Sequence, residues 1–132
     1  MARRRFGDDY PPDRQWSEKA TVVGRGFRFE GEILAEDVVI IGGRVDGSVR
    51  TPAMVHVLAG AVVNGPIEGG AVLIEGAVDG DITATEHCEL RHSGRVRGNI
   101  LGPRVAVAEG AYLQGRVRAT DGGVHRFRER RR

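Results

Sequence analysis

Val78-Asp79-Gly80-Asp81-Ile82 follows a simple formula, in which a glycine is flanked on each side by one variable residue and then by one apolar residue. The chain of 132 residues repeats this formula six times, and the glycines are Gly31, Gly47, Gly65, Gly80, Gly98 and Gly115. Successive glycines are 16, 18, 15, 18 and 17 residues apart. Self-similarity at a nearly constant interval predicts a solenoid in which each repeat forms one coil.

Each repeat contains three short apolar alternations rather than one. In the fourth repeat, Val72 and Ile74 form one pair, Val78 precedes the glycine, and Ile82 and Ala84 form the last pair. Alternation every second residue is the period of a β-strand. Frequent glycines and β-branched residues disfavour a helix. We therefore predict an all-β fold, a single-stranded β-helix of about six coils with three short strands in each.

The repeated glycine has a physical role in this prediction. We expect it where two strands meet, at a corner that either requires a positive φ or leaves no room for a Cβ. Coils would stack about 4.8 Å apart, so that equivalent aliphatic residues form continuous columns. The backbone hydrogen bonds of each coil would then go to its neighbours.

Composition divides the chain into three predicted segments. Residues 1–20 contain Pro11 and Pro12 and lack apolar periodicity, which predicts a disordered N-terminal arm. The β-helical domain is predicted over 21–120, and a disordered arginine-rich tail over 121–132. No apolar stretch approaches the length of a membrane-spanning helix. The single Cys88 excludes an intramolecular disulfide and fits a reducing compartment.

The repeats resemble the bactofilins, bacterial polymer-forming proteins built on a small β-helical domain. The resemblance covers residues 21–120 and rests on the six motifs, above all VDGSV (45–49), VDGDI (78–82) and VRGNI (96–100), and on the opening TVVGRGFRFEGEI (21–33). It implies a right-handed helix of triangular section. It also implies a cytoplasmic cytoskeletal scaffold that forms filaments without a nucleotide and recruits other proteins, such as cell-wall or cell-shape factors.

The resemblance also implies attachment at the inner face of the cytoplasmic membrane. In such proteins a short N-terminal stretch that mixes apolar and basic residues makes this contact. The residues that match it here are Arg3, Arg4, Arg5 and Phe6, and Asp8 and Asp9 directly after them depart from the pattern.

A β-helix has two open ends, and unpaired edge strands are templates for association unless they are covered. Neither arm has the pattern of a helical cap. We therefore predict that copies of the chain associate end to end, and the resemblance favours contacts between like ends. The residues predicted for the interface are Val23, Phe27 and Phe29 in the first coil and Tyr112, Leu113 and Val117 in the last.

An acyltransferase built on a left-handed β-helix is the first alternative. Such enzymes use strict hexapeptide repeats and a catalytic histidine, whereas the apolar residues here do not recur every six positions. We expect the histidines to be solvated and Cys88 to be a small core residue, because His87 would face the opposite side of its strand. The four histidines are His56, His87, His92 and His125.

No catalytic, cofactor or metal site is predicted. Lys19 is the only lysine and no glycine precedes it, so the chain lacks the Gly-Lys-Ser/Thr step of a phosphate-binding loop. Asp46, Asp79 and Asp81 do not recur in every coil, which favours turn residues over calcium ligands. No cysteine and histidine cluster has zinc spacing.

A basic-tailed adaptor that binds membrane or DNA without polymerising is the second alternative. The C-terminal arginines are Arg126, Arg128, Arg130, Arg131 and Arg132. We rank a role in solubility or spacing first, contact with the membrane second and DNA third, because the tail lacks the interleaved aromatic residues of single-strand binders.

Overall fold

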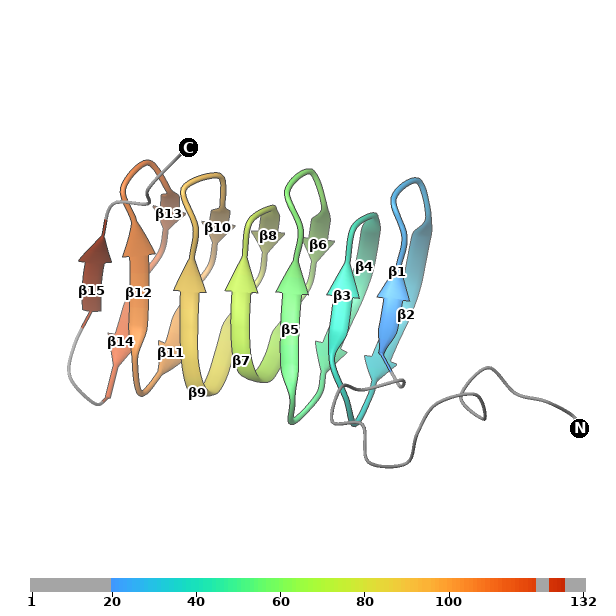
Figure 1. Ribbon diagram of the computed structural model, residues 1–132, viewed down its shortest axis with the longest axis horizontal. Coiled ribbons are helices and arrows are strands. Elements are labelled where there is room, and N and C mark those ends of the chain that lie inside the picture. Colours follow the sequence, from blue (N-terminus) through green and yellow to red (C-terminus); the bar gives the residue numbers. More distant parts are fainter. Residues whose placement is uncertain (1–19, 121–123, 128–132) are drawn as a thin grey trace, which may run out of the picture.

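The computed structural model describes residues 20–120 and 124–127 (Figure 1). All regular secondary structure in these residues is β-strand. The strands are β1 (Thr21–Val23), β2 (Arg28–Leu34), β3 (Val39–Ile41), β4 (Arg44–Arg50), β5 (Met54–Val57), β6 (Val62–Asn64), β7 (Ile67–Ile74), β8 (Ala77–Asp79), β9 (Ile82–Leu90), β10 (Arg95–Arg97), β11 (Ile100–Gly102), β12 (Val105–Ala108), β13 (Tyr112–Gln114), β14 (Val117–Ala119) and β15 (Val124–Phe127). All their pairings are parallel, and each joins one repeat to the next. The predicted all-β solenoid of about six coils is confirmed.

The coils have three sides, which we call A, B and C. Side A stacks the start of β2 and of β4 with β6, β8, β10 and β13. Side B stacks the end of β2 and of β4 with the start of β7 and of β9, then β11 and β14. Side C stacks β1, β3 and β5 with the end of β7 and of β9, then β12 and β15. Figure 1 shows side C at the front, with the coils following one another along the long axis.

Stacked aliphatic side chains fill the interior, because the apolar residues of each motif point inward. On side A the column consists of Phe29, Val45, Val63, Val78, Val96 and Leu113, each in register with the next. On side B the column consists of Ile33, Val49, Ile67, Ile82, Ile100 and Val117. The two apolar positions of each motif thus build two walls of the core.

The six motif glycines form a column between sides A and B, with φ between 129° and 158°. From Gly47 onward, a Cβ on each glycine would overlap the carbonyl group of the glycine one coil earlier. The motif therefore requires glycine for two reasons, a backbone conformation that L-residues avoid and contact with the adjacent coil. The crowding comes from the neighbouring coil rather than from the interior.

The C-terminal segment differs from the predicted disordered tail at four positions. Val124–Phe127 forms β15, which pairs with all four residues of β12 on side C. The exposed edge of β12 offers unpaired backbone groups, and a following segment can satisfy them by adding one more strand.

Candidate functional site

The N-terminal end of the solenoid presents two edge strands, β1 and β2, each paired on one side only among the described residues. Its rim carries large exposed apolar side chains: Val22 is 61%, Phe27 69% and Leu34 64% exposed. Of the predicted interface residues, Phe27 is thus accessible, whereas Val23 is buried and Phe29 packs against the core as a partly buried residue. Sequence reasoning missed Val22 and Leu34, although their alternation with Val23 and Ile33 places them on the outer surface.

The C-terminal end is formed by β13, β14 and β15, which also have one partner each among the described residues. Leu113 and Val117 are partly buried and pack against the core, so they close the last coil from inside. Tyr112 is in register with Arg95 and points outward from side A. Its ring centroid lies 5.7 Å from the Arg95 guanidinium carbon, and its hydroxyl is 3.1 Å from Oε1 of Gln114.

Polar side chains on side A link the first coils to one another. The Asp46 carboxylate accepts hydrogen bonds from Arg28 Nε at 3.0 Å, from Arg44 Nε at 3.2 Å and from Asn64 Nδ2 at 2.8 Å. The Asn64 and Arg44 hydrogen bonds lower the pKa of Asp46 from 3.8 to about 2. The carboxylate therefore stays ionised over the whole neutral and mildly acidic range, and its hydrogen bonds join side chains of coils one, two and three.

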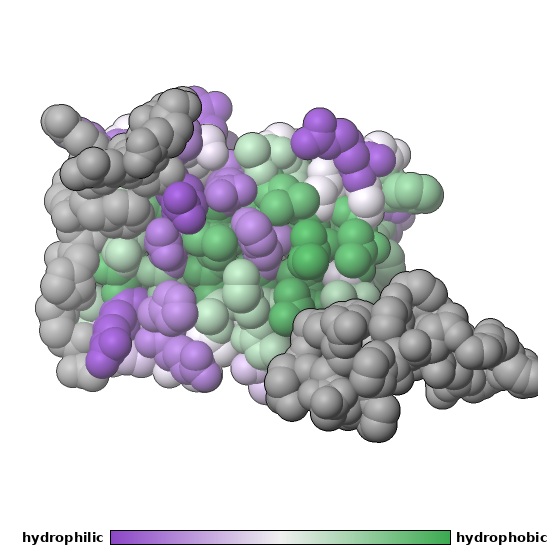
Figure 2. Space-filling model, viewed as in Figure 1, coloured by the Kyte–Doolittle hydropathy of each residue, from purple (hydrophilic) through white to green (hydrophobic). Residues whose placement is uncertain are grey.

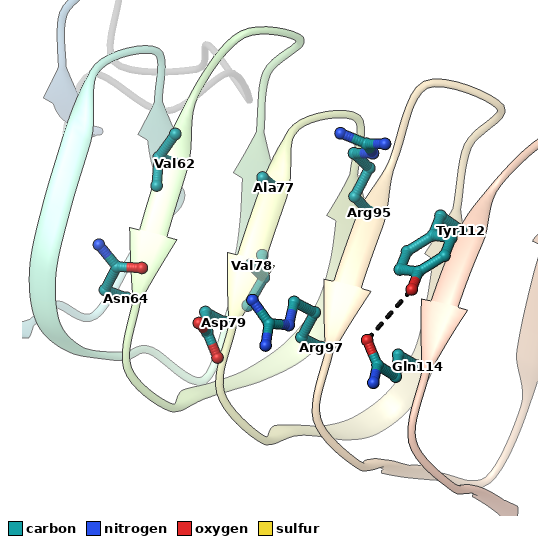
Figure 3. Close-up of a pocket in the computed structure, with 9 residues that line it drawn as sticks. All are labelled: Val62, Asn64, Ala77, Val78, Asp79, Arg95, Arg97, Tyr112 and Gln114. Atoms are coloured by element: carbon teal, nitrogen blue, oxygen red, sulfur yellow. Dashed lines mark hydrogen bonds between the residues drawn. The ribbon is translucent and has the colours of Figure 1, made fainter.

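A groove of about 480 Å³ crosses side A (Figure 3). Val62 and Ala77 are small and lie in the same outward column as Arg44 and Arg95, so the surface is low between the two arginines. Asn64, Asp79, Arg97 and Gln114 form the adjacent outward column, and the close-up shows them along the groove. Sequence reasoning missed this groove. It could have been found from Val62 and Ala77, which are small at the position that holds arginine in the neighbouring coils.

Cys88 and the histidines are the candidate nucleophile and metal ligands of the chain. No group of three metal-binding side chains occurs in residues 20–120 or 124–127. Cys88 is fully buried, in register with Val72 and Val105, and burial raises the pKa of its thiol to about 12. His56 points outward on side C with Nε2 at 3.5 Å from Oε1 of Glu75, and His87 is exposed.

Several predicted contacts lie outside the residues that the structure describes. They are Arg3, Arg4, Arg5, Phe6, Arg128, Arg130, Arg131 and Arg132. Arg126 belongs to β15, where its backbone is in register with Val107. Within the described part of the chain, no helix is long and apolar enough to cross a membrane.

Comparisons with known proteins show which family the sequence of this chain matches. The family model described as "Bactofilin: Polymer-forming cytoskeletal" matches residues 21–118. The chain is 36% identical over 97 residues to Bactofilin BacO of Myxococcus xanthus (strain DK1622), an alignment that covers 74% of this chain and 77% of that protein. It is 34% identical over 97 residues to Bactofilin BacP of the same strain, covering 74% of this chain and 40% of BacP. No solved structure matches significantly.

Proposed function

Because the chain belongs to the bactofilin family of polymer-forming cytoskeletal proteins, we propose that its solenoid assembles end to end into filaments without a nucleotide. The single observation that carries the proposal is the pair of open ends. Among residues 20–120 and 124–127, β1 and β2 at one end, and β13, β14 and β15 at the other, have one strand edge without a partner, which they offer to a second copy. Residues 21–120 act as the polymer unit, and the flanking arms contact other components of the cell.

The N-terminal end supplies the more apolar surface for this contact. Val22, Phe27 and Leu34 are each more than half exposed, and all three lie in the first coil. An end that docks on a second copy pairs the β1 and β2 edges and removes the exposed Phe27 ring from water, whereas Val22 and Leu34 point to the sides of the solenoid. At the other end, Leu113 and Val117 lose their remaining exposure when a further coil covers them.

The filaments serve as a non-enzymatic scaffold in the cytoplasm. They position other proteins, such as cell-wall or cell-shape factors, and the arms make contact with the inner face of the cytoplasmic membrane. The lateral sides A, B and C stay accessible in an end-to-end filament, so that a partner binds along the polymer without competing with assembly.

Negative-stain electron microscopy of the purified chain at near-physiological salt, with no nucleotide added, tests the assembly. We expect filaments a few nanometres wide. Phe27→Arg is expected to block one end and Leu113→Arg the other, leaving monomers or dimers, because each places a charge in a surface that becomes buried. Leu101→Arg is the matched control, since Leu101 is 41% exposed and points outward from side B one coil inside the C-terminal end.

Long filaments from both Phe27→Arg and Leu113→Arg would overturn the end-to-end arrangement. Small discrete oligomers of the unchanged chain at micromolar and higher concentration would overturn assembly itself. Sedimentation of the three variants and the unchanged chain at matched concentrations gives the same comparison in solution.

A further inference from the structure

Side C carries an apolar patch over its first four coils. The patch consists of Val22, Ile40, Met54, Leu58 and Leu73, which point away from the core. Val22 is 61% exposed and the other four are partly exposed. Figure 2 shows the corresponding hydrophobic surface on the half of this face that holds β1, β3 and β5. A contiguous apolar surface of this kind indicates an interaction site.

The patch ends abruptly along the same face. The outward column of side C consists of Val22, Ile40, His56, Leu73, Glu89 and Ala106, in register from β1 to β12. Glu89 replaces an apolar side chain at the fifth coil and lies 3.5 Å from Arg91 Nε. Figure 2 shows the polar half of the face next to the apolar half. The apolar character is therefore confined to the coils nearest the N-terminus and is not a property of the whole side.

The patch is built as a continuous surface. Leu58 covers Gly42, since its Cδ1 lies 3.4 Å from where a Cβ on Gly42 would be. His56 lies between Ile40 and Leu73 in the column, and its Nε2 is 3.5 Å from Oε1 of Glu75, so one polar pair lies within the patch. A flat apolar side chain seated on the patch would contact Ile40 or Leu73, which lie two coils apart on either side of His56.

We propose that this patch is the docking surface for the segment that precedes β1, and that Trp16 is the side chain seated on it. The segment comprises residues 1–19, outside the part of the chain that the structure describes, and it joins the fold at Ala20, directly before the strand that borders the patch. Trp16 is the only tryptophan of the chain. Docking does not depend on filament assembly.

The linker between Trp16 and β1 is long enough for Trp16 to reach the patch. Four residues lie between Trp16 and Thr21, and the five extended Cα–Cα steps that join the two residues span at most about 17 Å. Coils stack about 4.8 Å apart, so that Leu73, three coils from β1, lies about 14 Å away, whereas Glu89 lies about 19 Å away. Trp16 therefore reaches the entire apolar patch.

Tethering favours this occupant over a free partner. A segment joined by a short linker meets its site at an effective concentration in the millimolar range, so a weak intrinsic affinity is sufficient. A tryptophan buries a large area on docking, and only a few residues need to be ordered. When it is docked, the segment covers the patch, and when it is released, it exposes an apolar surface on the side of the solenoid.

Intrinsic fluorescence of the full-length chain tests the proposal, because its single tryptophan reports on residue 16 alone. We expect emission shifted to the blue of N-acetyltryptophanamide, and acrylamide quenching that is slower than for the free amide. Leu73→Glu is expected to reduce the docking equilibrium constant roughly tenfold or more, as the loss of one large apolar contact predicts. Emission then moves toward the value for free indole.

Leu101→Glu is the matched control, because Leu101 is a partly exposed leucine on side B, away from the patch. It should leave the emission of Trp16 unchanged. Leu73→Ser serves as a second variant if Leu73→Glu fails to fold by circular dichroism. All measurements are repeated in the Phe27→Arg chain, so that burial inside a filament is not mistaken for docking.

Three results would overturn the proposal. Solvent-like emission of the unchanged chain would show that Trp16 is not docked. Protection that Leu73→Glu does not reduce, or that Leu101→Glu reduces equally, would place Trp16 elsewhere. Protection that disappears on dilution of the Phe27→Arg chain, or that arises only with vesicles containing phosphatidylglycerol, would make a second copy or a lipid surface the occupant.

Discussion

The first coil and the inner coils carry the same motif in two different surroundings. Gly47 and the later glycines pack against the backbone of the preceding coil, whereas the nearest atom to a Cβ on Gly31 belongs to the ring of Phe29, at 3.8 Å. Likewise, Val63 is fully buried in the side A column, whereas Phe29 at its start is only partly buried. The same motif therefore contributes to the core where a coil lies on both sides of it, and it forms accessible surface where a coil lies on one side only.

The largest expected effect comes from adding a methyl group to the glycine column. Gly65→Ala should destabilise the fold by about 2–6 kcal/mol, since it combines an unfavourable φ with overlap against Gly47. Gly31→Ala and Gly60→Ala, where φ is also positive but no backbone atom lies within 4 Å, should cost only about 1–3 kcal/mol. Urea unfolding of the three variants gives the comparison.

Equal losses of stability at Gly31, Gly60 and Gly65 would mean that backbone conformation alone requires glycine and that contact between coils contributes nothing. Gly31→Ala also bears on the proposed assembly. If a second copy stacks on the first coil, Gly31→Ala should weaken filament formation more than Gly60→Ala does.

The second largest effect is expected from truncating isoleucines in the side B column, where an inner coil and the first coil should lose different amounts of stability. Ile67→Ala should cost about 2–5 kcal/mol, because Ile67 is fully buried with apolar neighbours on both sides. Ile33→Ala should cost less, since Ile33 starts the same column and has a coil on one side only. Thermal unfolding of both variants below the onset of assembly measures the difference. A larger loss at Ile33 would contradict the open N-terminal end.

The buried thiol provides a smaller effect. Cys88→Val should change stability by less than about 1.5 kcal/mol, since valine occupies the equivalent position at Val72 and Val105. The native thiol should resist alkylation at pH 8, because burial raises its pKa to about 12 and removes it from solvent. Fast alkylation of the native chain, at the rate seen in urea, would contradict this placement of Cys88.

The smallest effect is electrostatic and lies on the surface of side A. The folded pKa of Asp46 is lowered from 3.8 to about 2, so its contribution to stability is present above pH 3.8 and is lost as the pH falls toward 2. Asp46→Asn should flatten the stability profile in this window. Asn64→Ala removes the hydrogen bond with the largest effect on this pKa. It should raise the folded pKa of Asp46 toward 3.8 and so narrow the pH range over which stability is lost. An unchanged profile in both variants would rule out this linkage.

Much of the fold could be predicted from the spacing of the residues. The six glycines and their apolar neighbours predict coils, inward columns and parallel stacking, because alternation defines which face is buried and the interval defines the length of a coil. The alignment of Cys88 with Val72 and Val105 could be predicted for the same reason. These properties depend on local periodicity and need no knowledge of distant contacts.

Other properties depend on contacts between coils and on the ends. Val124–Phe127 carries no motif, yet it forms a strand that pairs with β12. Phe27 and Phe29 are the same residue type two positions apart, yet Phe27 is 69% exposed and Phe29 packs on the core. The groove of side A and the apolar patch of side C arise from outward residues of separate repeats that stacking brings together. The sequence by itself therefore determined the coil, while the tertiary structure decided which outward side chains become neighbours, because outward positions carry no periodic constraint from the core.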